Sequence, residues 1–347
     1  MLLTYRYRIK DATSATHLRR MARAVNFVWN FCGETQRSAR RSLRPSPTAY
    51  DLINLTAGTS RELGLHSDTV QAVCKQFAQS RRQHHRRPRW RRRKSLGWIP
   101  FQAPRAIRLD GDGVVFLKHR YRLWLSRPVE GVIKAGNFAE DARGRWYLNL
   151  HVEVAEHQDC GPGGVGLDLG LTTLATCSTG ERFENPRHLR EHAGALARAQ
   201  RAGRRARARA IHARIVNGRR HYLHHVSTRL VRDHQLIVVG NVNAAGLART
   251  RMAKSVLDAG WSALRGMLRY KAIRHGATYI EVDERGSTQI CSACAARSGP
   301  RGLKDLGVRT WDCPSCGVQH DRDTNAAINI LRSGRSAALQ LTEIPAL

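Results

Sequence analysis

Two Cys-x-x-Cys pairs constrain the fold of this chain more than any other feature. Cys291 and Cys294 form the first pair, and Cys313 and Cys316 follow after an eighteen-residue interval. Each tight turn can present two sulfurs to one metal ion, so the spacing predicts a four-thiolate zinc ribbon with one structural ion. The alternative is four ordinary cysteines, half-buried or oxidised in pairs, which the paired spacing disfavours. We place the ribbon at residues 286–317.

The charge balance indicates a polyanionic partner. The 347 residues include 59 Lys and Arg against 27 Asp and Glu, a net charge of +32. Such an excess opposes compaction unless a polyanion neutralises it, which favours nucleic acid. We find no long apolar run and no signal peptide, so a membrane partner is not expected. Four further cysteines are scattered like small core residues, which suits a reducing cytosol: Cys32, Cys74, Cys160 and Cys177.

The first half of the chain combines a strand pattern with an inserted helical pattern. Residues 2–9 alternate like a strand, and residues 99–154 show the same period of two over five or six short segments. This pattern predicts a small antiparallel barrel over 1–10 and 98–160. Helical periodicity lies between these parts and predicts a helical domain over 11–97, with helices at 14–41, 48–63 and 67–83.

The last of these helices runs into an arginine-rich tail. Arginine pairs with phosphates and tryptophan stacks on bases, so the tail predicts RNA or DNA contact. A plain solvated linker is the alternative, and the net charge disfavours it. The candidate contact residues are Arg81, Arg82, Arg86, Arg87, Arg89, Trp90, Arg91, Arg92 and Arg93.

Three buried strands organise the second half. The first opens the stretch 165–180, which reads as a strand, a tight turn and a further strand. The others lie near 235–240 and 277–284, and helical segments at 187–233 and 256–275 separate the three. Asp168 stands within the nearly continuous apolar pattern of the first strand. A buried charge there costs several kcal/mol unless it is paired, so Asp168 needs a partner such as a metal ion.

Three carboxylates stand at the ends of these elements. Asp168 is on the first strand, Glu284 follows the last strand, and Asp323 opens a C-terminal helix. This order predicts an RNase H-like domain over 161–285 and 318–347, in which the first strand is central and a late helix crosses it. Carboxylates placed in this way can hold two Mg²⁺ ions. One ion activates water and the other stabilises the leaving oxygen when a phosphodiester is hydrolysed. The chain is therefore expected to be an α/β multidomain protein.

Three stretches together resemble the TnpB family of transposon-encoded proteins. They are Val165–Leu171, the two cysteine pairs, and Asp321–Ile330. The family consists of RNA-guided DNA endonucleases related to the compact type V CRISPR effectors. The resemblance implies a wedge barrel with an inserted recognition domain, followed by a RuvC domain interrupted by the zinc ribbon. It also implies that Asp168 and Asp323 are the first and last RuvC aspartates.

The resemblance further implies the partners. They are a guide RNA from the transposon end and a double-stranded target DNA that is cut beside a short adjacent motif. Guide pairing supplies most of the target specificity in such a system. One protein per guide RNA is expected, in a prokaryotic cytosol or nucleoid.

One position departs from the family pattern. The second core strand usually ends in Glu, but here it ends in Gly240, which cannot bind metal. We expect Glu284 to fill the gap, because its strand should run beside this one; its surroundings also resemble family members with a relocated glutamate. Asp283 and Asp258 are weaker candidates, and Glu281 should point along the sides of its strand.

The vacancy at Gly240 leaves an alternative function open. A nuclease-dead, RNA-guided DNA-binding protein that acts as a repressor would need no glutamate there. A general zinc-ribbon nucleic-acid-binding protein is a third hypothesis, and it leaves Asp168 unexplained.

Three residues near Asp323 are given supporting roles. Arg322 is a candidate to orient a phosphate or carboxylate, and Asn325 to cap or brace the helix start. His320 either contacts a metal-bound water or is a plain surface histidine.

Overall fold

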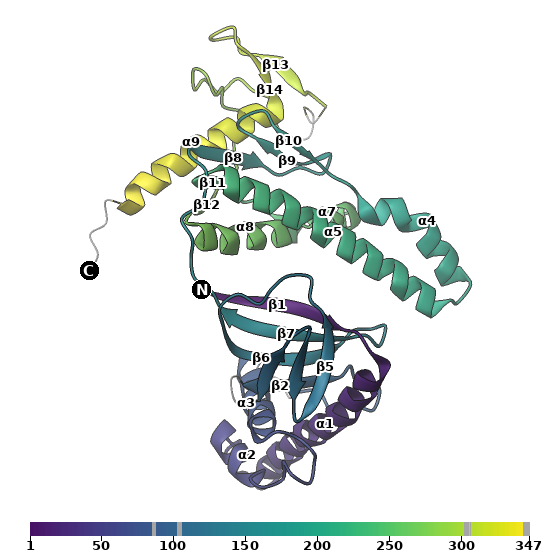
Figure 1. Cartoon of the computed structure of the whole chain (residues 1–347). Coiled ribbons are helices and arrows are strands. Elements are labelled where there is room, and N and C mark those ends of the chain that lie inside the picture. Colours follow the sequence, from purple (N-terminus) through teal and green to yellow (C-terminus); the bar gives the residue numbers. More distant parts are fainter. Residues whose placement is uncertain (85–87, 103–105, 302–304, 306, 343–347) are drawn as a thin grey trace. The chain divides into compact units, whose positions relative to one another are not determined.

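The computed structural model describes residues 1–84, 88–102, 106–301, 305 and 307–342, in two compact units, Met1–Ala155 and Glu156–Leu347. Figure 1 shows the elements of both units. Two residues of the arginine-rich tail, Arg86 and Arg87, lie outside the described residues. Among the described helices, none combines the length and the apolar character that a membrane crossing requires.

The first unit is built on a curled antiparallel sheet. Its strand order is β2-β6-β7-β1-β5-β4-β3. Strands β2 and β4 are far apart in this order, yet the rings of Phe101 and Phe116 are centred 5.6 Å apart. The sheet therefore curls until it is nearly closed, as the period-two pattern predicted. Its strands are β1 (Leu2–Ile9), β2 (Trp98–Gln102), β3 (Ile107–Asp110), β4 (Gly113–Phe116), β5 (His119–Trp124), β6 (Val132–Glu140) and β7 (Trp146–Glu153).

Three helices lie in the chain between β1 and β2: α1 (Ala12–Arg41), α2 (Ala49–Leu55) and α3 (Ser67–His84). Asp11 caps α1 by accepting a hydrogen bond from the Ser14 backbone N–H at 2.6 Å. A capping box between Thr48 and Asp51 starts α2. The prediction of a helix to residue 63 is wrong, because the chain after Leu55 continues in turns, with positive φ at Gly58 and Gly64.

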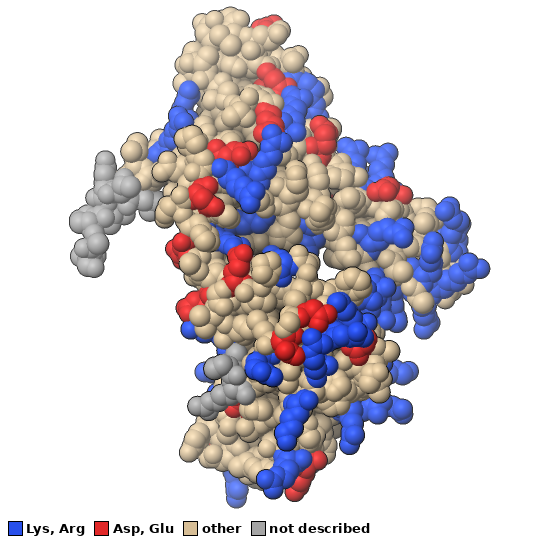
Figure 2. All heavy atoms as spheres, in the orientation of Figure 1, with Lys and Arg blue, Asp and Glu red and all other residues tan. Residues whose placement is uncertain are grey.

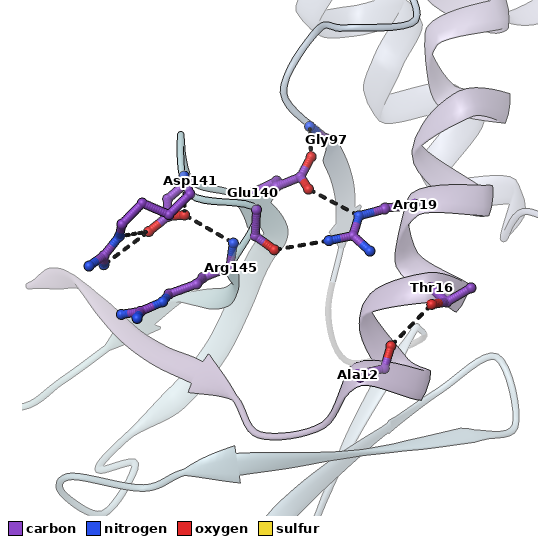
Figure 3. Close-up of polar contacts among 9 residues, drawn as sticks. Ala12, Thr16, Arg19, Gly97, Glu140, Asp141 and Arg145 are labelled. Atoms are coloured by element: carbon purple, nitrogen blue, oxygen red, sulfur yellow. Dashed lines mark hydrogen bonds and ion pairs between the residues drawn. The ribbon is translucent and has the colours of Figure 1, made fainter. Parts of the chain in front are cut away.

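A partly exposed polar network links α1 to the sheet (Figure 3). Glu140 of β6 accepts hydrogen bonds from Arg19 Nε of α1 at 3.2 Å and from the Gly97 backbone N–H at 3.1 Å. In the helical core, Trp29 packs edge-on against Phe77 with 5.2 Å between ring centroids. Cys32 and Cys74 are fully buried there, as predicted for small core residues.

The second unit contains a five-stranded mixed sheet in the order β10-β9-β8-β11-β12. Strand β8 is central; it is parallel to β11 and antiparallel to β9, and β11 is parallel to β12. The prediction that the first strand of this half is central is confirmed. The strands are β8 (Gly164–Asp168), β9 (Thr173–Cys177), β10 (Arg182–Glu184), β11 (Leu236–Gly240) and β12 (Thr278–Val282).

The helices of this unit are shorter than the periodicity suggested. The helical segment 187–233 is divided near Gly203, and 256–275 is divided at Gly260, where φ is +63° and +73° respectively. The helices are α4 (His188–Arg201), α5 (Arg205–Asp233), α6 (Ala244–Leu247), α7 (Ala253–Ala259), α8 (Trp261–His275) and α9 (Arg322–Thr342). A hairpin of β13 (Thr310–Asp312) and β14 (Gln319–Asp321) precedes α9.

The two faces of this sheet differ. Alternate residues such as Val165, Leu167 and Val239 point into an apolar core with α5 and α8. On the opposite face, α9 crosses β8 and β11 (Figure 1). A side chain at Gly166 would run into the Ala327 carbonyl oxygen and lie 2.7 Å from the Leu331 nitrogen. Glycine at this position therefore allows the α9 backbone to approach the sheet directly.

Candidate active site and metal-binding cluster

Strand alternation places Asp168 on the face that α9 covers. Asp168 is the last residue of β8, two positions after Gly166, and Asp323 lies in the first turn of α9. Burial, followed by the charges of Asp323 and Glu284, raises the pKa of Asp168 to about 7. Asp323 and Glu284, far from Asp168 in sequence, therefore lie near enough for their charges to act on Asp168.

Glu284 lies over the vacancy at Gly240. Gly240 pairs in register with Val282 of β12, so Glu284, two residues further on, follows on the same side of the sheet. A Cβ atom at Gly240 would lie 3.0 Å from Glu284 Oε2, 3.1 Å from Glu284 Cβ and 3.1 Å from Ile330 Cδ1. The Glu284 side chain thus occupies the space that a side chain at position 240 would need.

The Glu284 carboxylate is incompletely paired. Its Oε2 atom is buried and has no hydrogen-bond donor among the described residues. Burial, followed by the charge of Asp283, raises the pKa of Glu284. Buried carboxylate oxygens are normally satisfied by a donor or a cation. Together with Asp168 and Asp323, this oxygen fits the all-oxygen ligand preference of Mg²⁺.

The weaker substitutes for the missing glutamate lie elsewhere. Glu281 is on the opposite face, where it accepts hydrogen bonds from Arg269 Nη2 and Tyr279 Oη, both at 2.7 Å. Asp258 is buried in α7 and accepts from Arg219 Nη2 at 2.7 Å. Asp283 is exposed, 3.9 Å from Arg285 Nε. Glu284 is thus the candidate that the geometry favours.

The two aspartates around Arg322 have different surroundings. Asp321 Oδ1 accepts hydrogen bonds from the backbone N–H and the hydroxyl of Thr324, at 2.9 and 2.8 Å, and so caps α9. Its other oxygen pairs with Arg182 Nη2 at 2.7 Å. Asp323 has one ion pair, with Arg309 Nη1 at 3.5 Å. Asp321 serves the helix start, and Asp323 stays the candidate ligand.

Two asparagines of α9 clasp the loop that follows Glu284. The side-chain amides of Asn325 and Asn329 both donate to the carbonyl oxygens of Ser287 and Ile290, at 2.7–3.2 Å. The Ser287 N–H in turn donates to the Glu284 carbonyl at 3.1 Å. Asn325 therefore braces the start of α9 against this loop, as one of its two predicted roles had it. Sequence reasoning missed Asn329, although its i+4 spacing on the same helix face was a signal.

The structure shows the surroundings of the other two supporting residues. Arg322 is buried, its Nη1 donates to the Asp305 carbonyl at 2.6 Å, and its positive charge acts on Asp168, so its expected role toward a phosphate or carboxylate stays a prediction. His320 is also buried, with its Nε2 3.0 Å from Cys291 Sγ and its ring 4.7 Å from that of Trp311. It is a neighbour of the cysteine cluster and not a surface histidine.

The four predicted cysteines converge. Sγ atoms of Cys291 and Cys316, and of Cys294 and Cys313, are 3.7 Å apart. A tetrahedron with Zn–S bonds of about 2.3 Å has edges of about 3.8 Å, so the cluster fits a zinc ion. A hydrogen bond from Ser298 lowers the pKa of Cys313 to about 6, which favours the thiolate. Within the described ranges, no other group of three or more such ligands has all donor atoms within 4.8 Å. The three carboxylates are therefore less tightly gathered.

The arginine-rich tail is partly anchored to the protein. The Arg91 guanidinium donates to the Asn26 side chain and to the Leu96 carbonyl, and Arg81 donates to the Pro47 carbonyl at 2.8 Å. Trp90 is 52% exposed, with the Arg37 guanidinium 5.7 Å from its ring centroid. The remaining described members are exposed and stay candidates for nucleic-acid contact: Arg82, Arg89, Arg92 and Arg93.

A second basic surface lies on the α4–α5 hairpin. Figure 2 shows Lys and Arg side chains gathered at the far end of this hairpin. The apolar residues Leu196, Ile211 and Ile215 hold the two helices together in a small core of their own. The exposed arginines include Arg198, Arg201, Arg204, Arg205, Arg207 and Arg214.

Two family models match this chain. A model described as "Cas12f1-like, TNB domain" covers residues 261–330, which include all four cysteines and Asp323. A second, OrfB_IS605, described as "Probable transposase", covers residues 149–251, which include Asp168. TnpB-like protein L79 of Acanthamoeba polyphaga mimivirus is 28% identical over 36% of this chain and 25% of its own length. The chain belongs to the TnpB family.

Curated relatives of this TnpB chain carry a functional name. A "Putative RNA-guided DNA endonuclease" of Streptomyces pristinaespiralis is 38% identical over 58% of the chain. InsQ of Escherichia coli K12, with the same description, is 29% identical over 68% of the chain. The chain spans 52% and 66%, respectively, of the lengths of these two relatives.

A solved structure shares the fold. The Cas12f1 chain in a cryo-EM structure titled as a Cas12f1-sgRNA-target DNA complex aligns with a TM-score of 0.61 at 11% identity. The alignment covers 92% of this chain and 83% of that one. The mixed α/β fold of this chain is therefore similar to that of the Cas12f1 chain.

Proposed function

We propose that this chain is a transposon-encoded, RNA-guided DNA endonuclease that cuts target phosphodiesters through a two-metal RuvC site. The names of the curated relatives support this function. The observation that carries it is the Glu284 carboxylate, which lies over Gly240 with an unpaired buried oxygen and acts electrostatically on Asp168.

The topology supports the proposed domain assignment. A central β8 crossed by α9 supports an RNase H-like RuvC domain over 161–285 and 318–347, with the zinc ribbon at 286–317. The curled sheet corresponds to a wedge domain over 1–10 and 98–160. The helices between its strands correspond to a recognition domain over 11–97.

Asp168, Glu284 and Asp323 would hold the Mg²⁺ ions. When bound, the ions would supply activation of a water nucleophile and stabilisation of the leaving oxygen. The chain positions the ligands: β8 fixes Asp168, the first turn of α9 carries Asp323, and the asparagine clasp holds the loop after Glu284. The raised pKa of Asp168 leaves its carboxyl partly protonated near neutral pH, and a bound cation would favour the charged form.

Zinc would be held by the four cysteines in a purely structural role, since all four tetrahedral positions are filled by thiolates. The buried His320 beside Cys291 Sγ would orient that ligand. This arrangement keeps the ribbon attached to the start of α9, and therefore to Asp323.

The partners would be a guide RNA from the transposon end and a duplex DNA target, with one protein per guide. The net charge of +32 and the exposed arginines support nucleic-acid binding. Sequence choice would come mainly from guide pairing, with the protein reading a short adjacent motif.

The test begins with purification of the full chain with its co-purifying RNA, which is then sequenced. Duplex DNA that matches this RNA is offered with Mg²⁺. We expect the wild type to cut it and Asp168→Asn to bind it without cutting. A wild type that binds the target but never cuts would reject the nuclease and leave a guide-directed repressor. A protein that retains no RNA would reject RNA guidance.

A further inference from the structure

A cavity of about 430 Å³ lies in the second unit, beside the turn that follows β8. Leu171 and Thr172 of that turn form one wall, only three and four residues beyond Asp168. The start of α4 and the exposed side of α7 form the others. Its volume is within the range of about 300–1,000 Å³ that is typical of sites for small ligands.

Three cations around this cavity lack partners. The side chains of Arg187, Arg190 and Lys254 line it, and none has an ion pair or hydrogen bond within the part of the chain that the structure describes. The carboxylate in the lining, Asp258, is already paired: it accepts from Arg219 Nη2 at 2.7 Å and from the Leu189 backbone N–H at 2.8 Å. The cavity is therefore positively charged without a neutralising group of its own.

The rest of the lining is suited to the uncharged part of a ligand. Leu171, Leu189 and Ala193 give it an apolar side, and Thr172 and Ser255 add hydroxyl groups. Guanidinium and ammonium groups pair with phosphate, and apolar or guanidinium surfaces accept the face of a sugar or base. A nucleotide unit combines these two chemistries.

We propose that this cavity binds one nucleotide of the DNA strand that is being cut. The cations hold the phosphate, and the leucine side holds the sugar and base. A cavity of this size takes a nucleotide of a single strand and excludes a base-paired one. The inference rests on the proposed nuclease function, because that function is what would bring a DNA strand to this unit.

The test uses two kinds of variant in the full chain with its bound RNA. Arg190→Gln combined with Lys254→Gln removes two charges from the cavity. Ala193→Trp fills the cavity and keeps every charge, at an exposed position of α4. The matched control is Arg249→Gln combined with Arg251→Gln, which removes two exposed charges from the turn before α7, outside the cavity lining.

Binding of a short single-stranded DNA oligonucleotide is measured by fluorescence anisotropy in an Asp168→Asn background, where cutting cannot interfere. We expect each cavity variant to weaken binding about tenfold, and the control to weaken it by about twofold or less. Binding of the guide RNA should be unchanged, which shows that the variants fold.

Equal weakening by the charge-removal variant and the control would overturn the proposal. So would an Ala193→Trp variant that binds like its parent, because the strand would then be held by surface charge and not by the cavity. The readout does not depend on catalysis. A chain that binds through the cavity but never cuts would reject the nuclease alone, and a chain that cuts normally with a filled cavity would reject the cavity alone.

Discussion

The two predicted metal sites of the second unit are built in opposite ways. The cysteine cluster comes from two tight turns close together in the chain, and its sulfurs are already at the spacing of a tetrahedral edge. The carboxylates come from β8, the end of β12 and the start of α9, and they are less tightly gathered. A short loop can arrange ligands locally, whereas the carboxylates depend on how strands and helix pack across more than 150 residues.

The difference also concerns what the ions do for folding. The ribbon has a two-stranded sheet and few buried apolar residues, so its own core is small. The carboxylate edge is carried by a large apolar core between the sheet, α5 and α8. Zinc should therefore hold its domain together, while Mg²⁺ should serve chemistry on a fold that exists without it.

The largest expected effect is on the ribbon. Removal of zinc, or Cys313→Ser, should abolish hydrogen-exchange protection in β13 and β14, because structural zinc contributes on the order of 10 kcal/mol to such folds. Protection in β8 and β11 should remain. Cys160→Ser, outside the cluster, is the control. A ribbon that stays protected from exchange without zinc would show that zinc is not needed to hold its fold.

The second expected effect is a pH-dependent loss of stability that arises from the carboxyl group of Asp168. The folded pKa of Asp168 is raised to about 7 from its ordinary 3.8, so its contribution to stability is present at low pH and is lost as the pH rises through about 7. Without Mg²⁺, Asp168→Asn should therefore become more stable than wild type as the pH rises from 4 to 8, by roughly 2–4 kcal/mol at most.

Denaturant unfolding across this pH range measures the difference. Mg²⁺ should reduce it by stabilising the wild type selectively. A constant difference in the free energy of unfolding between the two proteins from pH 4 to 8 would show that the pKa of Asp168 is not raised in the folded protein.

The smallest expected effect distinguishes substitutions at Gly240 and Gly166, which lie on the same face of the sheet. Gly240→Ala should shift Glu284 by a few tenths of an ångström and slow cutting about tenfold, with little change in stability. Gly166→Ala should instead disturb the packing of α9 on β8, because its Cβ meets backbone atoms. Cutting rates and melting temperatures of the two variants distinguish these outcomes. A Gly240→Ala protein that cuts at the wild-type rate would remove the link between Gly240 and Glu284.

Local patterns made much of this architecture predictable. The cysteine spacing, the alternation of the strands and the placement of Asp168 each depend on neighbours in sequence, and all lie where the pattern indicated. The proximity of Glu284 to Gly240 was also foreseeable, because parallel pairing of adjacent strands fixes which residues share a side.

Other features depended on contacts that no local pattern records. A glycine within a helix costs only about 1 kcal/mol, so periodicity could not show that Gly203 and Gly260 divide their helices. Arg322 stands in a motif beside the site, and its burial against the Asp305 carbonyl required the folded ribbon. Three separate segments of the chain line the cavity near Leu171, and none of them has a sequence pattern that indicates a cavity.

The central claim is that Glu284 supplies the carboxylate missing at Gly240. Its most direct test is the single-turnover cutting rate of Glu284→Gln, loaded with guide RNA in Mg²⁺, beside Glu281→Gln on the opposite face of the same strand region. We expect Glu284→Gln to bind target DNA normally but to cut it at least a hundredfold more slowly, on the order expected when a group that stabilises the transition state is lost. Glu281→Gln should cut at nearly the wild-type rate. A Glu284→Gln protein that cuts as fast as Glu281→Gln would show that Glu284 does not supply the missing carboxylate.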